Sequence, residues 1–143
     1  MSAGVTVANE CVEEFERLKM KKAYHYITFK LDNEMTHIVV DKTLKSNICD
    51  SDVANKRFLQ ELVEVGDCRY AVFNAQWQDQ LTIKNKIVFF AWSPEDSPAR
   101  HKMVYTASKD HLKKALSIVL ELQGTTINEF DFKEVMARIM QGK

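Results

Sequence analysis

A cationic segment in the second half of the chain carries the side chains best suited to chemistry, and that chemistry is molecular recognition. Met103 and Asp110 lie in this segment together with the cations Arg100, Lys102, Lys109, Lys113 and Lys114. Cations steer the encounter with an acidic partner, and a flexible apolar side chain such as Met103 supplies affinity at the centre of an interface. The segment therefore favours a protein interface. Anionic lipid headgroups are an alternative ligand, and a solvated helix face is the simplest alternative.

Histidine, cysteine and serine side chains could support catalysis or metal binding, but their spacing indicates neither. His25, His37, His101 and His111 match no metal-binding spacing, and the three cysteines form no CxxC pair. No serine stands in a GxSxG context, and four glycines are too few for a phosphate-binding loop. We therefore expect a protein that is not an enzyme and that uses no metal or cofactor.

Composition describes one soluble domain with balanced charge. The 143 residues include 20 basic and 20 acidic side chains, so the formal net charge is zero, which argues against general nucleic-acid binding. The few cysteines suit an intracellular, reduced protein, and the start of the chain resembles no signal peptide. No apolar run reaches the roughly 20 residues that cross a bilayer. We expect a flexible tail over residues 1–6 and a single domain over residues 7–141.

Hydrophobic spacing predicts the elements that must position the cationic segment. A helix should follow Asn9, because Cys11, Phe15 and Leu18 recur at helical spacing. Two strands of alternating pattern, residues 24–31 and 36–41, should form a hairpin. A second helix should begin near residues 50–52, bury Phe58, Leu59, Leu62 and Val63, and end at Gly66.

The remaining pattern predicts two strands, the cationic helix and a last strand and helix. Residues 69–77 and 87–92 should be strands joined by a polar, exposed connection over residues 78–86. The cationic helix should run from about Ala99 to Gly124. Its core side chains would be Tyr105, Leu112, Ala115, Leu116 and Val119. A strand near residues 126–129 and a last helix, burying Phe132, Val135, Met136, Ile139 and Met140, would complete a mixed, mostly antiparallel sheet with helices on both faces.

Several motifs in order resemble the actin-depolymerising factor/cofilin family. The signature combines Trp-x-Pro, Lys-Met-x-Tyr and Ser-Lys-Asp, which appear here at residues 92–94, 102–105 and 108–110. The resemblance extends over nearly the whole chain. Gly4-Val5 is similar to the family's N-terminal Gly-Val, residues 67–71 are similar to the entry to its third strand, and residues 121–123 are similar to the end of its long helix.

This resemblance implies an α/β (α+β) domain of the ADF-homology, gelsolin-like fold, with five strands and four main helices. It implies a cytoplasmic, monomeric protein of the actin cytoskeleton that binds actin monomers and filaments, prefers ADP-actin, and promotes filament depolymerisation and severing. Phosphoinositide headgroups would compete for its cations. The residues at matching positions in the first actin-binding face are Ser2, Ala3, Gly4, Val5, Arg100, Lys102, Met103, Lys109, Asp110, Lys113 and Lys114.

A second face, used only in filaments, is matched less completely. Lys84, Lys86 and Arg138 stand at its basic positions, but Ala137 and Gln141 replace charges that many members carry. We therefore expect weaker severing and a modest, salt-sensitive filament affinity. Many members also carry a phosphorylated serine directly before Gly-Val. Ala3 fills that position here, so Ser2 is the candidate phosphorylation site.

Two alternative functions remain open from the sequence. One is an ADF-homology relative of the glia maturation factor or coactosin type, although those relatives generally lack the combined Lys-Met-x-Tyr and Ser-Lys-Asp pattern. The other is a module whose chief ligand is phosphoinositide.

Overall fold

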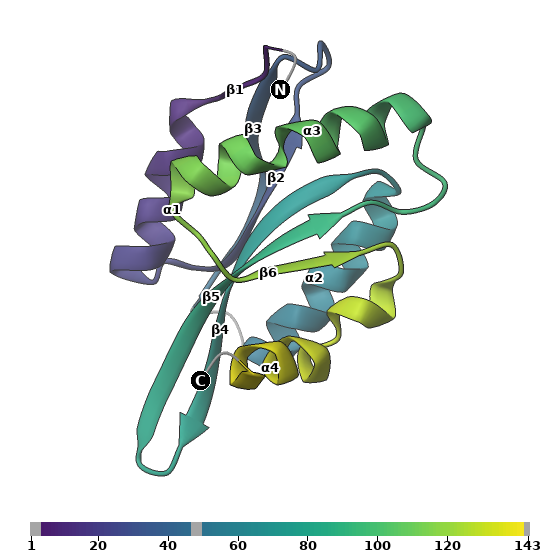
Figure 1. Cartoon of the computed structure of the whole chain (residues 1–143). Coiled ribbons are helices and arrows are strands. Elements are labelled where there is room, and N and C mark those ends of the chain that lie inside the picture. Colours follow the sequence, from purple (N-terminus) through teal and green to yellow (C-terminus); the bar gives the residue numbers. More distant parts are fainter. Residues whose placement is uncertain (1–3, 47–49, 142–143) are drawn as a thin grey trace.

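A single six-stranded sheet organises the chain and carries helices on both faces (Figure 1). The computed structural model describes residues 4–46 and 50–141. In chain order the elements are β1 (Thr6–Val7), α1 (Asn9–Lys21), β2 (Tyr24–Leu31), β3 (His37–Lys45), α2 (Ser51–Val65), β4 (Arg69–Asp79), β5 (Thr82–Trp92), α3 (Ala99–Leu116), β6 (Glu121–Gly124), the 3-10 helix η1 (Ile127–Phe130) and α4 (Phe132–Gln141).

The sheet is mixed and mostly antiparallel, as expected, with strand order β1-β3-β2-β4-β5-β6. The two outermost pairs, β1 with β3 and β5 with β6, are parallel, and the inner pairs are antiparallel. The expected strand count of five was one too low, because the two-residue β1 also pairs with β3. So short a strand has too few residues to show a period of two in the sequence.

Two hydrophobic layers lie on opposite faces of the sheet. One joins α1 and α3 to the sheet through side chains such as Phe15, Leu18 and Leu112. The other joins α2 and α4 through Phe58 and Ile139 among others. Figure 1 shows α3 crossing one end of the sheet, with α2 and α4 on the far side. Successive residues of the central strands point alternately into one layer and the other, so these strands are apolar on both faces.

Helix ends agree with the sequence for α2 but not for α3. Gly66 ends α2 with φ of 66°, as predicted. The cationic helix ends at Leu116, where Ser117 takes a φ of 56°, and not at Gly124. The predicted helix was too long and placed Ala115 and Val119 in the core. In the structure Ala115 is exposed and Val119 is 90% exposed. A serine in this left-handed conformation gives no sequence signal comparable to a glycine.

The segment after α3 was also assigned wrongly. Residues 121–123, matched to a helix end, form β6, and the strand predicted near residues 126–129 is the 3-10 helix η1. Thr126 and Glu129 form a capping box there, a pattern that indicates a helical start. Gly124 closes β6, where an added Cβ would lie 2.9 Å from the Phe130 ring, so this glycine serves close packing.

Three further predictions differ from the structure in extent. The connection predicted over residues 78–86 is instead strand: β4 reaches Asp79 and β5 begins at Thr82, forming a long exposed hairpin (Figure 1). Val63 and Met140, predicted inside, are 61% and 43% exposed. Within the predicted tail, Val5 is 3% exposed and belongs to the α1–α3 layer.

Candidate binding surface

The first turn of α3 is fastened to the start of β4 by one carboxylate. Asp67 Oδ1 accepts hydrogen bonds from the Cys68 N–H and the Ser97 hydroxyl, both at 2.8 Å. Asp67 Oδ2 lies 2.8 Å from His101 Nδ1. The helix begins directly after Pro98, which is its N-cap residue and has an extended backbone. These contacts set where the cationic segment begins.

Asp67 gives this fastening a predictable pH dependence. Partial burial acts to raise the pKa of Asp67, but hydrogen bonds from Cys68, Ser97 and His101 outweigh it and hold the pKa below its usual value. A carboxyl whose pKa is depressed by folding contributes stability above its unfolded pKa and loses it as the pH falls through its folded pKa. Asp67→Asn should therefore lower the free energy of unfolding by about 1 kcal/mol near neutral pH.

That stability difference should shrink in acid, and denaturant unfolding at a series of pH values would measure it. The difference in unfolding free energy between wild type and Asp67→Asn should stay constant above the unfolded aspartate pKa of about 3.9 and become smaller below it. Asp96→Asn, on an exposed loop aspartate, is the matched control and should change little. A gap that persists unchanged to the lowest accessible pH would contradict this role of Asp67.

The rotation of α3 about its axis is fixed by two tyrosines. Tyr105 is 6% exposed, and its hydroxyl accepts a hydrogen bond from the Leu31 N–H at 2.9 Å. The Tyr70 hydroxyl donates to the Tyr105 carbonyl oxygen, and the two rings lie 5.1 Å apart. Ser108 and Leu112 are also fully buried on this side of the helix. Because the inner face is held at several points, the outer face is presented in one orientation.

The outer face presents a methionine among charges, as predicted. Met103 is 66% exposed, and Arg100, Asp110 and Lys114 are exposed as well. Lys102 is partly exposed, and its ammonium donates to the Glu95 carbonyl oxygen at 2.5 Å. Met103 therefore lies outside the core on a helix whose inner face is fixed, as its position in the sequence predicted.

Two of the predicted lysines have an intramolecular partner that the sequence did not reveal. Lys109 Nζ lies 2.8 Å from Glu121 Oε2, and Lys113 Nζ lies 2.5 Å from Glu121 Oε1. The Gln123 amide also donates to Glu121 at 2.7 Å. Burial acts to raise the pKa of Glu121, but the bonds from Lys109, Lys113 and Gln123 outweigh it and lower the pKa. Glu121 was missed because its segment was taken for a helix end.

The N-terminal part of the predicted face is only partly described. Ser2 and Ala3 lie outside the described residues. Gly4 is exposed with φ of 85°, whereas the Val5 side chain is packed inside the α1–α3 layer. The strand that follows, β1, contacts α3. Val5 therefore anchors this segment beside α3 and is too deeply buried to contact a partner through its side chain.

The second predicted face is a single hollow between the β4–β5 hairpin, the segment after α3, and α4. Lys84, Lys86 and Arg138 all line this hollow, whose volume is about 650 Å³. Lys84 is paired with Asp79 at 2.8 Å. The sequence did not predict its apolar part, where Val119 is 90% exposed and Ile83 is 75% exposed. Ala137 and Gln141, the uncharged positions, are exposed on α4.

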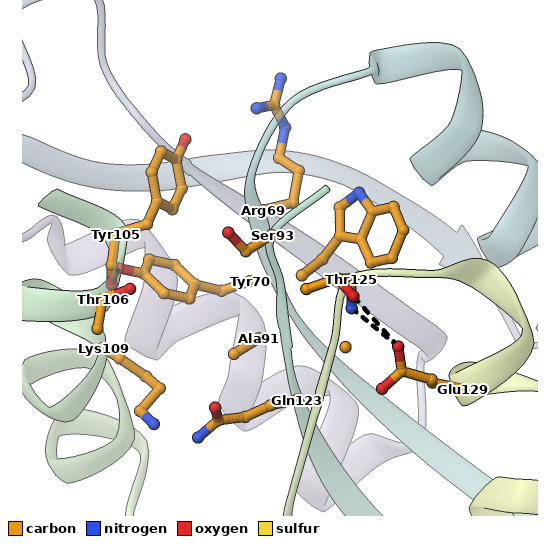
Figure 2. Close-up of a pocket in the computed structure, with 12 residues that line it drawn as sticks. Arg69, Tyr70, Ala91, Ser93, Tyr105, Thr106, Lys109, Gln123, Thr125 and Glu129 are labelled. Atoms are coloured by element: carbon orange, nitrogen blue, oxygen red, sulfur yellow. Dashed lines mark hydrogen bonds between the residues drawn. The ribbon is translucent and has the colours of Figure 1, made fainter. Parts of the chain in front are cut away.

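A smaller cavity of about 210 Å³ separates α3 from β5 and β6 (Figure 2). Its charged groups already have partners: Lys109 binds Glu121, Arg69 binds Asp41 at 3.0 Å, and Glu129 accepts hydrogen bonds from Thr125, drawn as dashed lines. Within residues 4–46 and 50–141 no group of three or more His, Cys, Asp or Glu side chains could hold a metal ion. The charged side chains of this cavity thus serve internal contacts.

None of the described helices combines the length and hydrophobicity that crossing a bilayer requires. The fold and the outer side of α3 together define a protein-interaction domain, in which the sheet presents one helix with an exposed methionine among charges. Similarity to known proteins shows which family of protein-interaction domains this is. A family model described as cofilin/tropomyosin-type actin-binding protein matches residues 4–140.

The cofilin of Mycosarcoma maydis is 39% identical over 141 residues, covering 97% of this chain and 96% of that protein. The crystal structure of Streptomyces griseoflavus cofilin superimposes with a TM-score of 0.85 at 35% identity, covering 98% of this chain and all of that one. Glia maturation factor from Caenorhabditis elegans matches with a TM-score of 0.73, but 15% identity shows a shared fold alone. The chain belongs to the cofilin/actin-depolymerising factor family of actin-binding proteins.

Proposed function

We propose that this chain binds actin monomers and filaments through the α3 face and promotes filament depolymerisation and turnover in the cytoplasm. The observation that carries the proposal is the orientation of Met103, exposed among cations on a helix whose inner face is fixed to the sheet. Family membership supplies the partner, and it supports a binding protein over an enzyme. The α3 face would comprise the described residues Gly4, Arg100, Lys102, Met103, Asp110 and Lys114, with Val5, Lys109 and Lys113 in supporting positions.

The proposed mechanism uses binding free energy alone, and no covalent bond is made or broken. A ligand shifts a filament between two conformations only by its differential affinity for them. Preference for ADP-actin would direct the protein to older filament segments, and boundaries between decorated and bare segments would be mechanically weak. Imaging of labelled filaments, with breaks counted against protein concentration, tests this proposal. Breaks that rise with concentration and then decline at full decoration would support it, whereas intact filaments with no loss of polymer would oppose it.

The hollow lined by Lys84, Lys86 and Arg138 would provide the contact that only a filament offers. Its cations supply steering, and the exposed Val119 and Ile83 would supply apolar contact. Because few charges surround this apolar part, we expect a modest filament affinity that falls as salt screens the cations.

Replacing all three cations by alanine should separate filament binding from monomer binding. The triple variant Lys84→Ala, Lys86→Ala, Arg138→Ala should lower filament affinity about tenfold in low salt and leave monomer affinity within about twofold. Co-sedimentation with filaments at two salt concentrations, together with a monomer titration, would measure both effects.

A matched control removes three exposed lysines elsewhere, Lys42, Lys45 and Lys56, with the same change in net charge. If that control weakens filament binding as much as the first triple variant, the effect is one of net charge and the hollow has no specific role. Tight filament binding of the wild type that salt does not weaken would also contradict this assignment.

Two regulatory features stay predictions of the family resemblance. A phosphate on Ser2 would repel an acidic actin surface, although Ser2 stands one residue before the usual position. Phosphoinositide headgroups would compete for exposed cations such as Arg100 and Lys114. The identity of 35–39% with cofilins favours this function over that of glia maturation factor.

A further inference from the structure

Glu121 holds two lysines of α3 in a compact cluster at the start of β6. Its two carboxylate oxygens are divided between them, at 2.8 Å to Lys109 Nζ and 2.5 Å to Lys113 Nζ. The Gln123 amide binds the same carboxylate and completes its hydrogen bonding. The three charged side chains are only 13–21% exposed. An ion pair this shielded from water is screened by salt far less than a surface pair.

This cluster changes the charge that α3 offers to a ligand. Lys109 and Lys113 stand one helical turn apart, so without a carboxylate between them their ammonium groups would repel and extend into water. With Glu121 in place, both are drawn toward β6. The outward cations are then Arg100, one turn before Met103, and Lys114, near the end of the helix. The exposed pattern is therefore sparser than the sequence suggests.

We infer that Glu121 is a specificity-determining residue, which restrains Lys109 and Lys113 so that the α3 face selects a shaped protein surface over generic polyanions. The inference rests on the proposed function, because it concerns selectivity at the same face. Affinity for a generic polyanion grows with the number of accessible cations. Affinity for one protein surface depends on a fixed arrangement of anchors such as Met103. Restraining two lysines lowers the first affinity with little effect on the second.

Glu121→Gln tests the inference, because glutamine keeps the size and the accepting oxygen but removes the charge. The matched control is Glu64→Gln, an exposed position on α2 with the same change in net charge. Two probes are used: monomeric ADP-actin, and vesicles of phosphatidylcholine and phosphatidylserine in equal parts. Relative to the control, Glu121→Gln should bind the vesicles about fivefold more tightly in low salt, and this gain should vanish in high salt. Actin affinity should stay within about twofold.

A second variant guards against a purely structural effect. Adding Lys113→Gln to Glu121→Gln restores the net charge and leaves Lys109 as the one released cation, so most of the gain in vesicle binding should be lost. Unfolding curves would fix a temperature at which all variants are folded. Equal vesicle binding by Glu121→Gln and Glu64→Gln would overturn the inference. So would a similar decrease in the affinity of Glu121→Gln for both actin and vesicles. If the wild type fails to bind actin, the proposed function fails, while the vesicle comparison still reports whether Glu121 restrains the two lysines.

Discussion

Met103→Ala should weaken binding to monomeric actin by about thirtyfold, corresponding to about 2 kcal/mol. Met103 is 66% exposed in the first half of α3, one turn after Arg100 on the same helix. A flexible thioether at such a position fills a partner's apolar recess and is desolvated on binding. Alanine keeps the helix, since it is the strongest helix former, so the fold should be unaffected. A fluorescence titration of labelled actin monomers would measure the change.

The control for this variant is Met20→Ala, which shortens a methionine that is 72% exposed on α1, outside the proposed face. It should leave actin affinity unchanged. Binding of Met103→Ala to anionic vesicles separates the two candidate ligands of this helix. If actin is the chief partner, vesicle binding should barely change, since lipid headgroups interact with the cations. Equal losses for actin and vesicles, or no loss for actin, would contradict the assignment of Met103 as the anchor.

Phe58→Ala should lower the free energy of unfolding by about 3–5 kcal/mol, the largest stability effect expected here. Phe58 is fully buried on α2. Its ring lies between 5.0 and 6.5 Å from four others, namely Tyr26, Phe73, Phe90 and Phe130. Truncation leaves a cavity between the sheet and α2 that this ring cluster cannot close. Since domains of this kind are stable by about 5–15 kcal/mol, the variant would lose a large share of its stability.

Denaturant unfolding would measure this loss, with Val63→Ala as control. Val63 lies on the same helix but is 61% exposed, so its truncation should cost little. Phe58 belongs to the α2–α4 layer, on the face of the sheet away from α3. At a temperature where the variant is still folded, its actin affinity should equal that of the wild type. A loss below about 1 kcal/mol would show that the aromatic cluster relaxes around the missing ring.

The sequence was most informative where local pattern and tertiary packing agree. Alternation identified β2 as a strand, the apolar run in β5 identified a strand covered on both faces, and Gly66 identified the end of α2. Tyr105 and Leu112 were correctly placed on the inner side of α3, which left Met103 outside. These features depend on spacing within one element, which is the information that a single sequence contains.

The sequence was least informative after Leu116, where long-range contacts decide the structure. β6 is held by parallel pairing with β5, and a strand of four residues is too short to be predicted from hydrophobic periodicity. The error moved Val119 from an exposed hollow into a predicted core, and it hid Glu121. Lys109 and Lys113 could be placed on the helix from sequence, but their shared partner follows only from the crossover between α3 and β6.

Binding of actin by α3 through Met103 can be tested on monomers alone. Labelled ADP-actin and ATP-actin monomers would be titrated with the wild-type chain and with Met103→Ala. We expect saturable one-to-one binding by the wild type, tighter for ADP-actin, and an affinity about thirtyfold lower for the variant. Absence of binding by the folded wild type, or equal affinities for wild type and variant, would contradict this expectation.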